Sequence, residues 1–275
     1  MDKYDTHVIQ IMASDTFQAI RKSPKDQWED LGTYICQELR KKSWHFSVTD
    51  VASRDRVQYN DPAMPVIGHA ELGRAINSQK GSRAPGPDGI NPAIVKLLYS
   101  RIPDLFLGLF NSLLRFSYCP GVWKFAIVIF FGKRGKPVEL AQSYRPICLL
   151  QSLSKVLEKI INNRLILYLE RNSAIHNRQY GFRERRGTTH CLNDVISCVK
   201  TRNIRYKHTV MVVFDFAGAF DCANWQIILD KLAESAVDPY LINIACSYLN
   251  NRGVGFRDGD TWVRFNIDRG CPQGS

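Results

Sequence analysis

Two short apolar segments set the main constraint on the fold. WKFAIVIFF (123–131) and TVMVVFDF (209–216) are continuous runs rich in Val, Ile and Phe. Runs of this length and composition favour buried strands. Between them, apolar residues recur at i, i+3, i+4, i+7 and i+8, the spacing of an amphipathic helix, at Leu153, Val156, Leu157, Ile160 and Ile161. The chain is therefore predicted to be α+β, with interleaved helices and paired strands.

Turn residues define the remaining elements. GKRGKP follows the first apolar run and YRPICLL (144–150) returns, which predicts a hairpin with a basic tip. SRAPGPDGINP (82–92) is predicted to be a rigid turn because Pro and Gly punctuate it. GVGFRDGDTWVRFNI (253–267) is predicted to be a second hairpin. Helices are predicted over residues 69–79, 92–100, 103–117, 188–202 and 238–251, and from near Cys222, where the apolar residues Trp225, Ile228, Leu229 and Leu232 follow at helical spacing.

Composition excludes several classes of protein. The chain has 275 residues, 45% of them hydrophobic, which is enough for a substantial core. No apolar run approaches the ~18 residues of a membrane span, and the N-terminus has no signal-peptide pattern, so an intracellular protein without a membrane partner is expected. The eight cysteines are scattered without a C-x-x-C pair. They favour reduced thiols over a zinc site or a disulfide framework.

Positive charge is concentrated in one part of the chain. The net charge is +11, and residues 133–207 hold 16 basic and 5 acidic residues, while the other 200 residues hold 21 of each. A focused basic block is typical of proteins that bind a polyanion, most often a phosphate backbone. A solvated cationic face is the alternative that charge alone leaves open.

Asp215 directly follows the second apolar run. A carboxylate at the end of a strand can hold Mg²⁺, although such residues also cap turns. Ala217 stands where a dehalogenase-type phosphatase needs a second Asp, and GKRGKP lacks the final hydroxyl residue of a P-loop. Neither of these two phosphate-handling classes fits.

Seven motifs occur in a defined order along residues 80–275: APGPDGI, FFGKRGKPVELAQSYRPICLL, SKVLEKIINNRL, QYGFRERRGTTH, FDFAGAFD, SYLNNR and GCPQGS. This series resembles the reverse transcriptase domain of non-LTR (LINE-type, jockey-like) retrotransposons. The resemblance implies a right-hand polymerase fold, here the fingers and an incomplete palm, over residues 81–275. Residues 1–80 would be a partly helical lead-in.

The resemblance also implies roles at the catalytic centre, where two Mg²⁺ ions activate the primer 3′-hydroxyl and stabilise the departing pyrophosphate. Asp215 matches the first metal-binding carboxylate, and the Phe216 backbone carbonyl assists. Phe220 matches the side chain that excludes a ribose 2′-hydroxyl; from the residues alone it could instead belong to the core. Asp221 is a metal contact or the N-cap of the following helix.

Further residues match nucleotide and nucleic-acid contacts. Arg145 corresponds to the arginine that clamps the triphosphate, a task suited to a planar guanidinium. Lys133 or Lys136 would supply a second phosphate contact, and Gln273 and Gly274 would line the nucleotide and the template base. The candidate contacts to the nucleic-acid backbone are Arg183, Arg185, Arg186, Lys155 and Lys159.

The aromatic-x-Asp-Asp motif that should follow GCPQGS is absent, since the chain has no adjacent Asp pair. The sequence therefore predicts a fragment of a reverse transcriptase that is inactive by itself. A non-enzymatic nucleic-acid-binding remnant of a retroelement is the alternative. The expected partners are an RNA template, a DNA primer or target, and deoxynucleoside triphosphates, and the resemblance implies the nucleus as the location.

Overall fold

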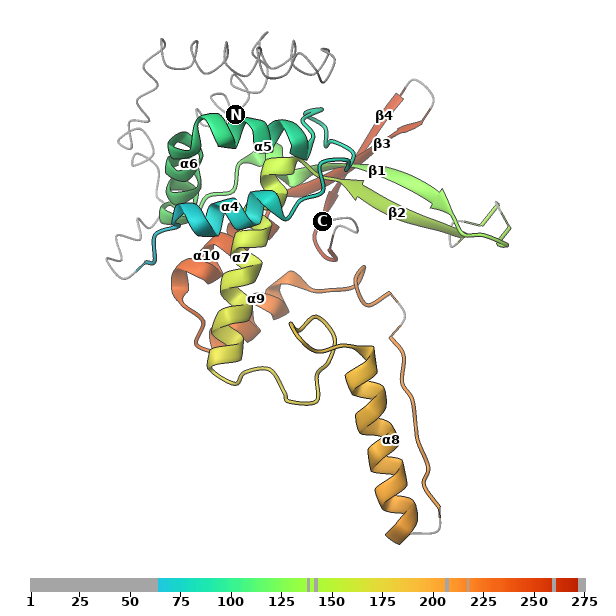
Figure 1. Ribbon diagram of the computed structural model, residues 1–275. Coiled ribbons are helices and arrows are strands. Elements are labelled where there is room, and N and C mark those ends of the chain that lie inside the picture. The colour runs from blue at the N-terminus through green and yellow to red at the C-terminus, as the bar shows by residue number, and fades with distance from the viewer. Residues whose placement is uncertain are drawn as a thin grey trace, which may run out of the picture.

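The computed structural model of the protein describes residues 64–137, 139–140, 143–205, 208–216, 218–258 and 261–271 (Figure 1). Residues 1–63, most of the predicted lead-in, lie outside this part of the chain. The elements in chain order are α4 (His69–Asn77), α5 (Pro92–Arg101), α6 (Pro103–Arg115), a 3₁₀ turn η3 (Gly121–Lys124), β1 (Phe125–Gly132), β2 (Tyr144–Leu149), α7 (Ser152–Arg171), α8 (Thr188–Arg205), α9 (Trp225–Glu234), α10 (Pro239–Leu249), β3 (Arg252–Asp258) and β4 (Thr261–Ile267).

Local sequence signals explain where the first helices begin. Asn91 caps α5, since its side-chain oxygen accepts a hydrogen bond from the Ile94 N–H at 3.0 Å. Pro92 and Pro103 occupy first-turn positions of α5 and α6, where a proline costs no hydrogen bond. The helices predicted over 69–79, 92–100 and 103–117 are thereby confirmed within a few residues.

Helix α7 is the centre of the main hydrophobic core. The side chains of Val156, Leu157 and Ile160 are fully buried, as the helical spacing predicts. They belong to one cluster with residues of α4, α5, α6 and α10, and with Trp123, whose ring lies 6.1 Å from that of Phe110. The boundary predicted at residue 80 stays a prediction, and α4 contributes to the same core as the later helices.

The four strands within the described residues form one sheet in the order β2-β1-β3-β4. β1 and β2 pair antiparallel from Ile127 opposite Leu149 to Gly132 opposite Tyr144, which confirms the predicted basic-tipped hairpin. β3 and β4 form the second predicted hairpin. The two hairpins share only a short parallel contact between Phe125–Ile127 and Gly253–Gly255, and beyond it they diverge (Figure 1). The fold is therefore a mixed arrangement of helices and a four-stranded sheet.

The turn in APGPDGI is tied to the start of α7. The buried residue Gly86 lies against the backbone of Leu150 and Gln151, and a Cβ atom there would approach the Gln151 nitrogen to 2.5 Å. The Ile90 carbonyl accepts a hydrogen bond from the Ser152 hydroxyl at 2.8 Å. The rigid turn predicted from the prolines and glycines therefore packs on the first turn of the central helix.

The strand predicted for residues 209–216 is wrong for this structure. The segment forms neither helix nor strand, and Val210 and Phe214 are 89% and 83% exposed. A strand needs a neighbouring strand for its N–H and C=O groups, and neither edge of the four-stranded sheet pairs with this segment. The apolar pattern alone does not supply such a partner.

Two further observations concern the helices. The predicted helices at 188–202 and 238–251 are confirmed as α8 and α10, and α8 projects from the other elements in Figure 1. Among the described residues, no helix combines the length and apolar composition that crossing a bilayer requires.

We expect Gly86→Ala to destabilise the protein by about 1–3 kcal/mol, because the added methyl group meets backbone atoms that cannot rotate away. Urea unfolding followed by circular dichroism measures the change. Gly108→Ala on α6 is the control: a Cβ there meets nothing within 4 Å, and alanine favours the helix by up to about 1 kcal/mol. Equal stability of the two variants would contradict the packing described for the turn.

Candidate functional site

Two motifs that lie about fifty residues apart in the sequence meet through backbone hydrogen bonds. The Cys271 N–H donates to the Phe220 carbonyl at 2.9 Å, and the Gly270 N–H donates to the Ala223 carbonyl at 2.8 Å. The Trp225 indole Nε1–H donates to the Gly270 carbonyl at 2.7 Å. These contacts join the end of FDFAGAFD to the start of GCPQGS. We call residues 218–225 and 269–271 the motif junction.

Glycine suits the backbone on both sides of the motif junction. Gly270 has φ +82°, and a Cβ atom there would lie 2.9 Å from the Asp221 carbonyl oxygen. Gly218 has φ +64°, and its carbonyl accepts hydrogen bonds from the Asp221 and Cys222 N–H groups, both at 3.0 Å. The glycines of the two motifs thus permit a tight turn and a close approach of two backbones.

Asp221 does not cap the following helix. Asn224 is the N-cap of α9, and its side-chain oxygen accepts from the Ile227 N–H at 3.2 Å. Asp221 lies three residues earlier, in the turn that Gly218 begins. The capping alternative considered from the sequence is therefore wrong, because α9 starts at Trp225 rather than near Cys222.

Phe220 lies at the surface of the motif junction. Its side chain is 51% exposed, so it is not a core residue. The ring of Phe182, in QYGFRERRGTTH, meets it edge to face with centroids 6.1 Å apart. The structure therefore brings three of the sequence motifs together around Phe220.

Asp215 and Phe216 lie in the segment 208–216, and the Phe216 side chain is 81% exposed. Within the described ranges, no three His, Cys, Asp or Glu side chains gather in an arrangement that could hold a metal ion. The described residues thus assemble no complete metal site of the kind that the resemblance implies. Gln273 and Gly274 lie outside the described residues.

The predicted phosphate contacts of the first hairpin occupy its exposed part. Arg145 is an exposed residue of β2, directly opposite Phe131 of β1. Lys133 and Lys136 belong to the connecting turn, in which the Lys136 N–H donates to the Lys133 carbonyl at 3.2 Å. Both lysines therefore lie at the tip of the hairpin.

The loop QYGFRERRGTTH is organised by its own arginines. Arg183 makes a two-pronged ion pair with Glu170, with nitrogen–oxygen distances of 2.6 and 2.5 Å, and its side chain is only 7% exposed. The hydrogen bond from Arg183 lowers the pKa of the Glu170 carboxyl. Arg186 donates to the Asn177 carbonyl, and Arg185 is exposed with φ +60°. Arg183 thus holds the loop on α7, and Arg185 keeps an outward-facing position.

The two lysines of α7 have different surroundings. Lys155 is buried, and burial, reinforced by the nearby charge of Arg83, lowers its pKa. This placement argues against a direct contact between Lys155 and a nucleic-acid backbone. Lys159, one turn later, is exposed.

The motif SYLNNR forms a buried polar joint that sequence reasoning did not assign. Tyr248 donates to a Glu158 carboxylate oxygen at 3.1 Å, and burial raises its pKa. The Arg252 guanidinium lies 4.4 Å from the Tyr248 ring centroid and donates to the Tyr248 carbonyl at 3.0 Å. Arg252 is 1% exposed and begins β3, so this joint links β3 to α7 and α10. The only sequence signal for it is the motif itself.

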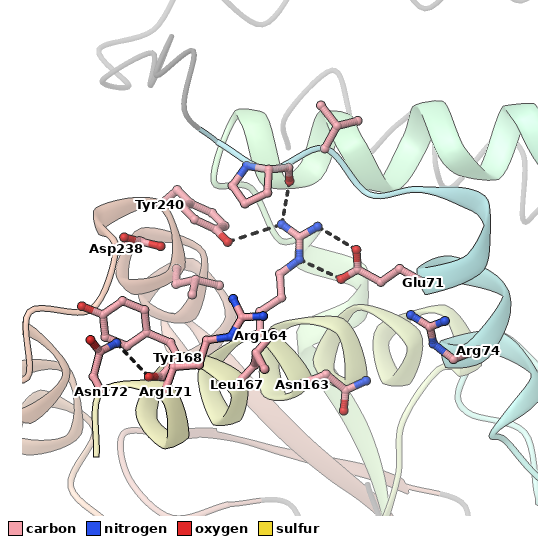
Figure 2. A pocket seen from close by; sticks show the side chains of 13 residues that line it. Glu71, Arg74, Asn163, Arg164, Leu167, Tyr168, Arg171, Asn172, Asp238 and Tyr240 are labelled. Atoms are coloured by element: carbon pink, nitrogen blue, oxygen red, sulfur yellow. Dashed lines mark hydrogen bonds and ion pairs between the residues drawn. The ribbon is translucent and has the colours of Figure 1, made fainter. Parts of the chain in front are cut away.

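A pocket of about 450 Å³ lies between α4, α7 and α10 (Figure 2). Arg164 reaches across it and donates to both oxygens of Glu71, at 2.7 and 2.8 Å, and to the Pro65 carbonyl at 2.7 Å. Burial by itself would lower the pKa of Arg164. The hydrogen bond to Glu71 and the negative charge of Glu71 outweigh this effect, so the pKa of Arg164 is raised. None of the predicted site residues that the structure describes lines this pocket, and its principal ion pair holds α4 against α7.

Comparison with known proteins agrees with the resemblance that the motifs indicate. The family described as reverse transcriptase (RNA-dependent DNA polymerase) matches residues 132–275. This range begins at the end of β1 and includes β2, both sides of the motif junction and SYLNNR. The chain belongs to the reverse transcriptase family.

Particular relatives come from non-LTR retroelements. The Pol polyprotein from the type-1 retrotransposable element R1 of Bradysia coprophila is 32% identical over 83% of this chain and 22% of the relative. The probable RNA-directed DNA polymerase from transposon X-element of Drosophila melanogaster is 34% identical over 74% and 23%. The RNA-directed DNA polymerase from mobile element jockey of the same species is 33% identical over 70% and 21%. The chain spans about a fifth of the length of these curated relatives.

We expect Gly270→Ala to open the motif junction, since its Cβ would meet the Asp221 and Phe220 carbonyl oxygens at 2.9 and 3.2 Å. Hydrogen exchange at the amides of residues 270 and 271 should become at least about ten-fold faster as their hydrogen bonds break. Gly135→Ala in the hairpin turn is the matched control, because Gly135 also has a positive φ, +76°, but open space around it. Unchanged protection at residue 271 in Gly270→Ala would refute the junction.

Proposed function

We propose that this chain forms the fingers and the first part of the palm of a right-hand polymerase that copies RNA into DNA for a non-LTR retroelement. The observation that carries the proposal is the motif junction. Two motifs that the resemblance assigns to one nucleotide pocket, FDFAGAFD and GCPQGS, are joined by backbone hydrogen bonds. Family membership supports the same activity.

In this proposal the first hairpin and the motif junction bind the incoming deoxynucleoside triphosphate. Arg145 and one of the turn lysines, Lys133 or Lys136, contact its phosphates, since exposed cations at a hairpin tip can reach a polyanion. Phe220 lies under the sugar, where a half-exposed ring can exclude a 2′-hydroxyl by steric conflict. Gln273 and Gly274, which come shortly after Cys271 in the chain, complete this pocket.

Mg²⁺ is the cofactor that the family implies, and two ions supply the chemistry of nucleotidyl transfer. We assign Asp215, the Phe216 carbonyl and Asp221 as the ligands that this chain contributes. A two-metal site needs more carboxylates than the described residues bring together.

The nucleic-acid partners are an RNA template and a DNA primer or target. Arg185, Lys159 and the hairpin lysines are surface cations of the basic block 133–207, and they suit contacts to a phosphate backbone. Arg186 donates a hydrogen bond to the Asn177 carbonyl and lies over the Tyr180 ring, and it remains exposed. Target-primed synthesis in the nucleus is the setting that the resemblance implies.

We expect the 275-residue chain to bind an RNA–DNA hybrid with an affinity that falls on the order of a hundred-fold between 50 and 200 mM salt, because bound cations release counterions. Fluorescence anisotropy measures the dissociation constant. The double variant Lys133→Gln/Lys136→Gln should reduce the salt slope by about 1 for each phosphate that the protein no longer neutralises. Primer extension by this chain is not expected. Salt-independent binding would contradict the role of the basic block.

Catalysis is tested in a chimaera of the Drosophila melanogaster jockey polymerase whose matched residues are replaced by those of this chain. The chimaera should synthesise DNA on an RNA template with Mg²⁺, and Asp215→Asn should lower the rate by on the order of a hundred-fold or more, because a metal-binding charge is removed. Asp230→Asn on α9 is the control and should change little. A chimaera that binds the hybrid but makes no DNA, or that tolerates Asp215→Asn, would refute the proposed activity.

A further inference from the structure

The outer part of the four-stranded sheet has two faces with different chemistry. Cross-strand partners share a face, so the register places Phe131 with Arg145 and Arg257 with Trp262. Residues two apart on a strand also share a face, which adds Arg264 to the face of Trp262. We call the face that carries Phe131, Arg145, Arg257, Trp262 and Arg264 the arginine face.

The opposite face is apolar, and we call it the phenylalanine face. The rings of Phe130 and Phe256 meet edge to face at 5.5 Å, and those of Phe256 and Phe265 stack at 6.2 Å. Toward the base of the sheet this face continues into the buried residues Ala126 and Cys148. Among the strand residues whose side chains the structure describes, its only cation is the buried Arg252.

At the base of the arginine face, the aromatic ring of Phe125 packs between β3 and an arginine side chain. Phe125 lies over β3 where Gly253 and Gly255 carry no side chains, and a Cβ at residue 255 would approach the Phe125 ring to 2.7 Å. The Arg264 guanidinium lies 5.2 Å from the centroid of this ring. The glycines therefore allow an aromatic ring and an arginine to stack in layers above the strand.

Exposed aromatic rings extend the arginine face beyond this base. Trp262 is 48% exposed and Phe131 is 52% exposed, and each lies beside an arginine on the neighbouring strand. Half-exposed Trp and Phe side chains therefore lie next to several cations. Unpaired nucleotides can bind to both kinds of group. The rings offer surfaces for bases, and the arginines offer charge for phosphates.

We propose that the part of the arginine face on β3 and β4 binds single-stranded nucleic acid, with a base stacking on Trp262 and phosphates meeting Arg257 and Arg264. This inference rests on the proposed function, which supplies unpaired template and primer strands. The β3–β4 hairpin has a suitable scale, since side chains two residues apart on one strand are about 7 Å apart and those on its two paired strands about 5 Å apart. A duplex keeps its bases stacked inside, so it can use the arginines but not the rings.

The test uses the full 275-residue chain with single-stranded oligo(rU) and oligo(dT) and with an RNA–DNA hybrid. Trp262→Ala should weaken single-strand binding about ten-fold and hybrid binding much less. Trp262→Phe should retain most of the affinity. Arg264→Gln should instead reduce the salt slope by about 1. If Trp262→Ala weakens the binding of oligo(rU), the face is assigned to an RNA strand. If it weakens the binding of oligo(dT) alone, the face is assigned to a DNA strand.

Phe265→Ala is the matched control, because Phe265 lies on the same strand and is 53% exposed but faces the phenylalanine face. It should leave single-strand affinity unchanged, and thermal unfolding should show that both alanine variants remain folded. Equal affinities for wild type, Trp262→Ala and Arg264→Gln would overturn the inference while leaving the proposed function intact. Failure of the wild-type chain to bind any of the three nucleic acids would instead count against the proposed function itself.

Discussion

The burial of the first half of α7 is the interaction on which the rest of the structure depends. Val156, Leu157 and Ile160 are fully buried, and side chains from four other helices belong to the same hydrophobic cluster. The APGPDGI turn rests on the first turn of α7, and SYLNNR reaches it through the hydrogen bond from Tyr248 to Glu158. Farther along, Arg164 ties α7 to α4. Motifs from both ends of the described chain are therefore held in place by contacts with the same helix, α7.

The sheet extends this arrangement to the site. β3 is anchored at its base by Arg252, and β4 leads directly into Arg269, Gly270 and Cys271. The hydrogen bonds of Gly270 to Ala223 and of Cys271 to Phe220 join the hairpin to the FDFAGAFD turn. A buried arginine remote from the candidate chemistry thus helps to position the motif junction, because a strand that is fixed at one end also fixes the direction of the chain beyond it.

Most helices and both hairpins could be predicted because their signals are local. Helical spacing, prolines at first-turn positions and glycine-rich turns act within a few residues. Local signals say less about groups whose surroundings come from elsewhere in the chain. Residues 209–216 have the composition of a buried strand but no strand partner in the described part of the structure. Arg183 and Lys155 have the charge of phosphate contacts, but one is paired with Glu170 and the other is buried.

The sequence by itself determined the family, the order of the motifs, the apolar stripe of α7 and the residue types available to a nucleotide pocket. Only the tertiary structure decided that FDFAGAFD and GCPQGS touch, that Asn224 rather than Asp221 caps α9, and that the two faces of the sheet differ in charge. The physical reason is that composition and spacing describe neighbours along the chain. Burial, ion pairing and backbone hydrogen bonds between remote segments exist only after the chain has folded back on itself.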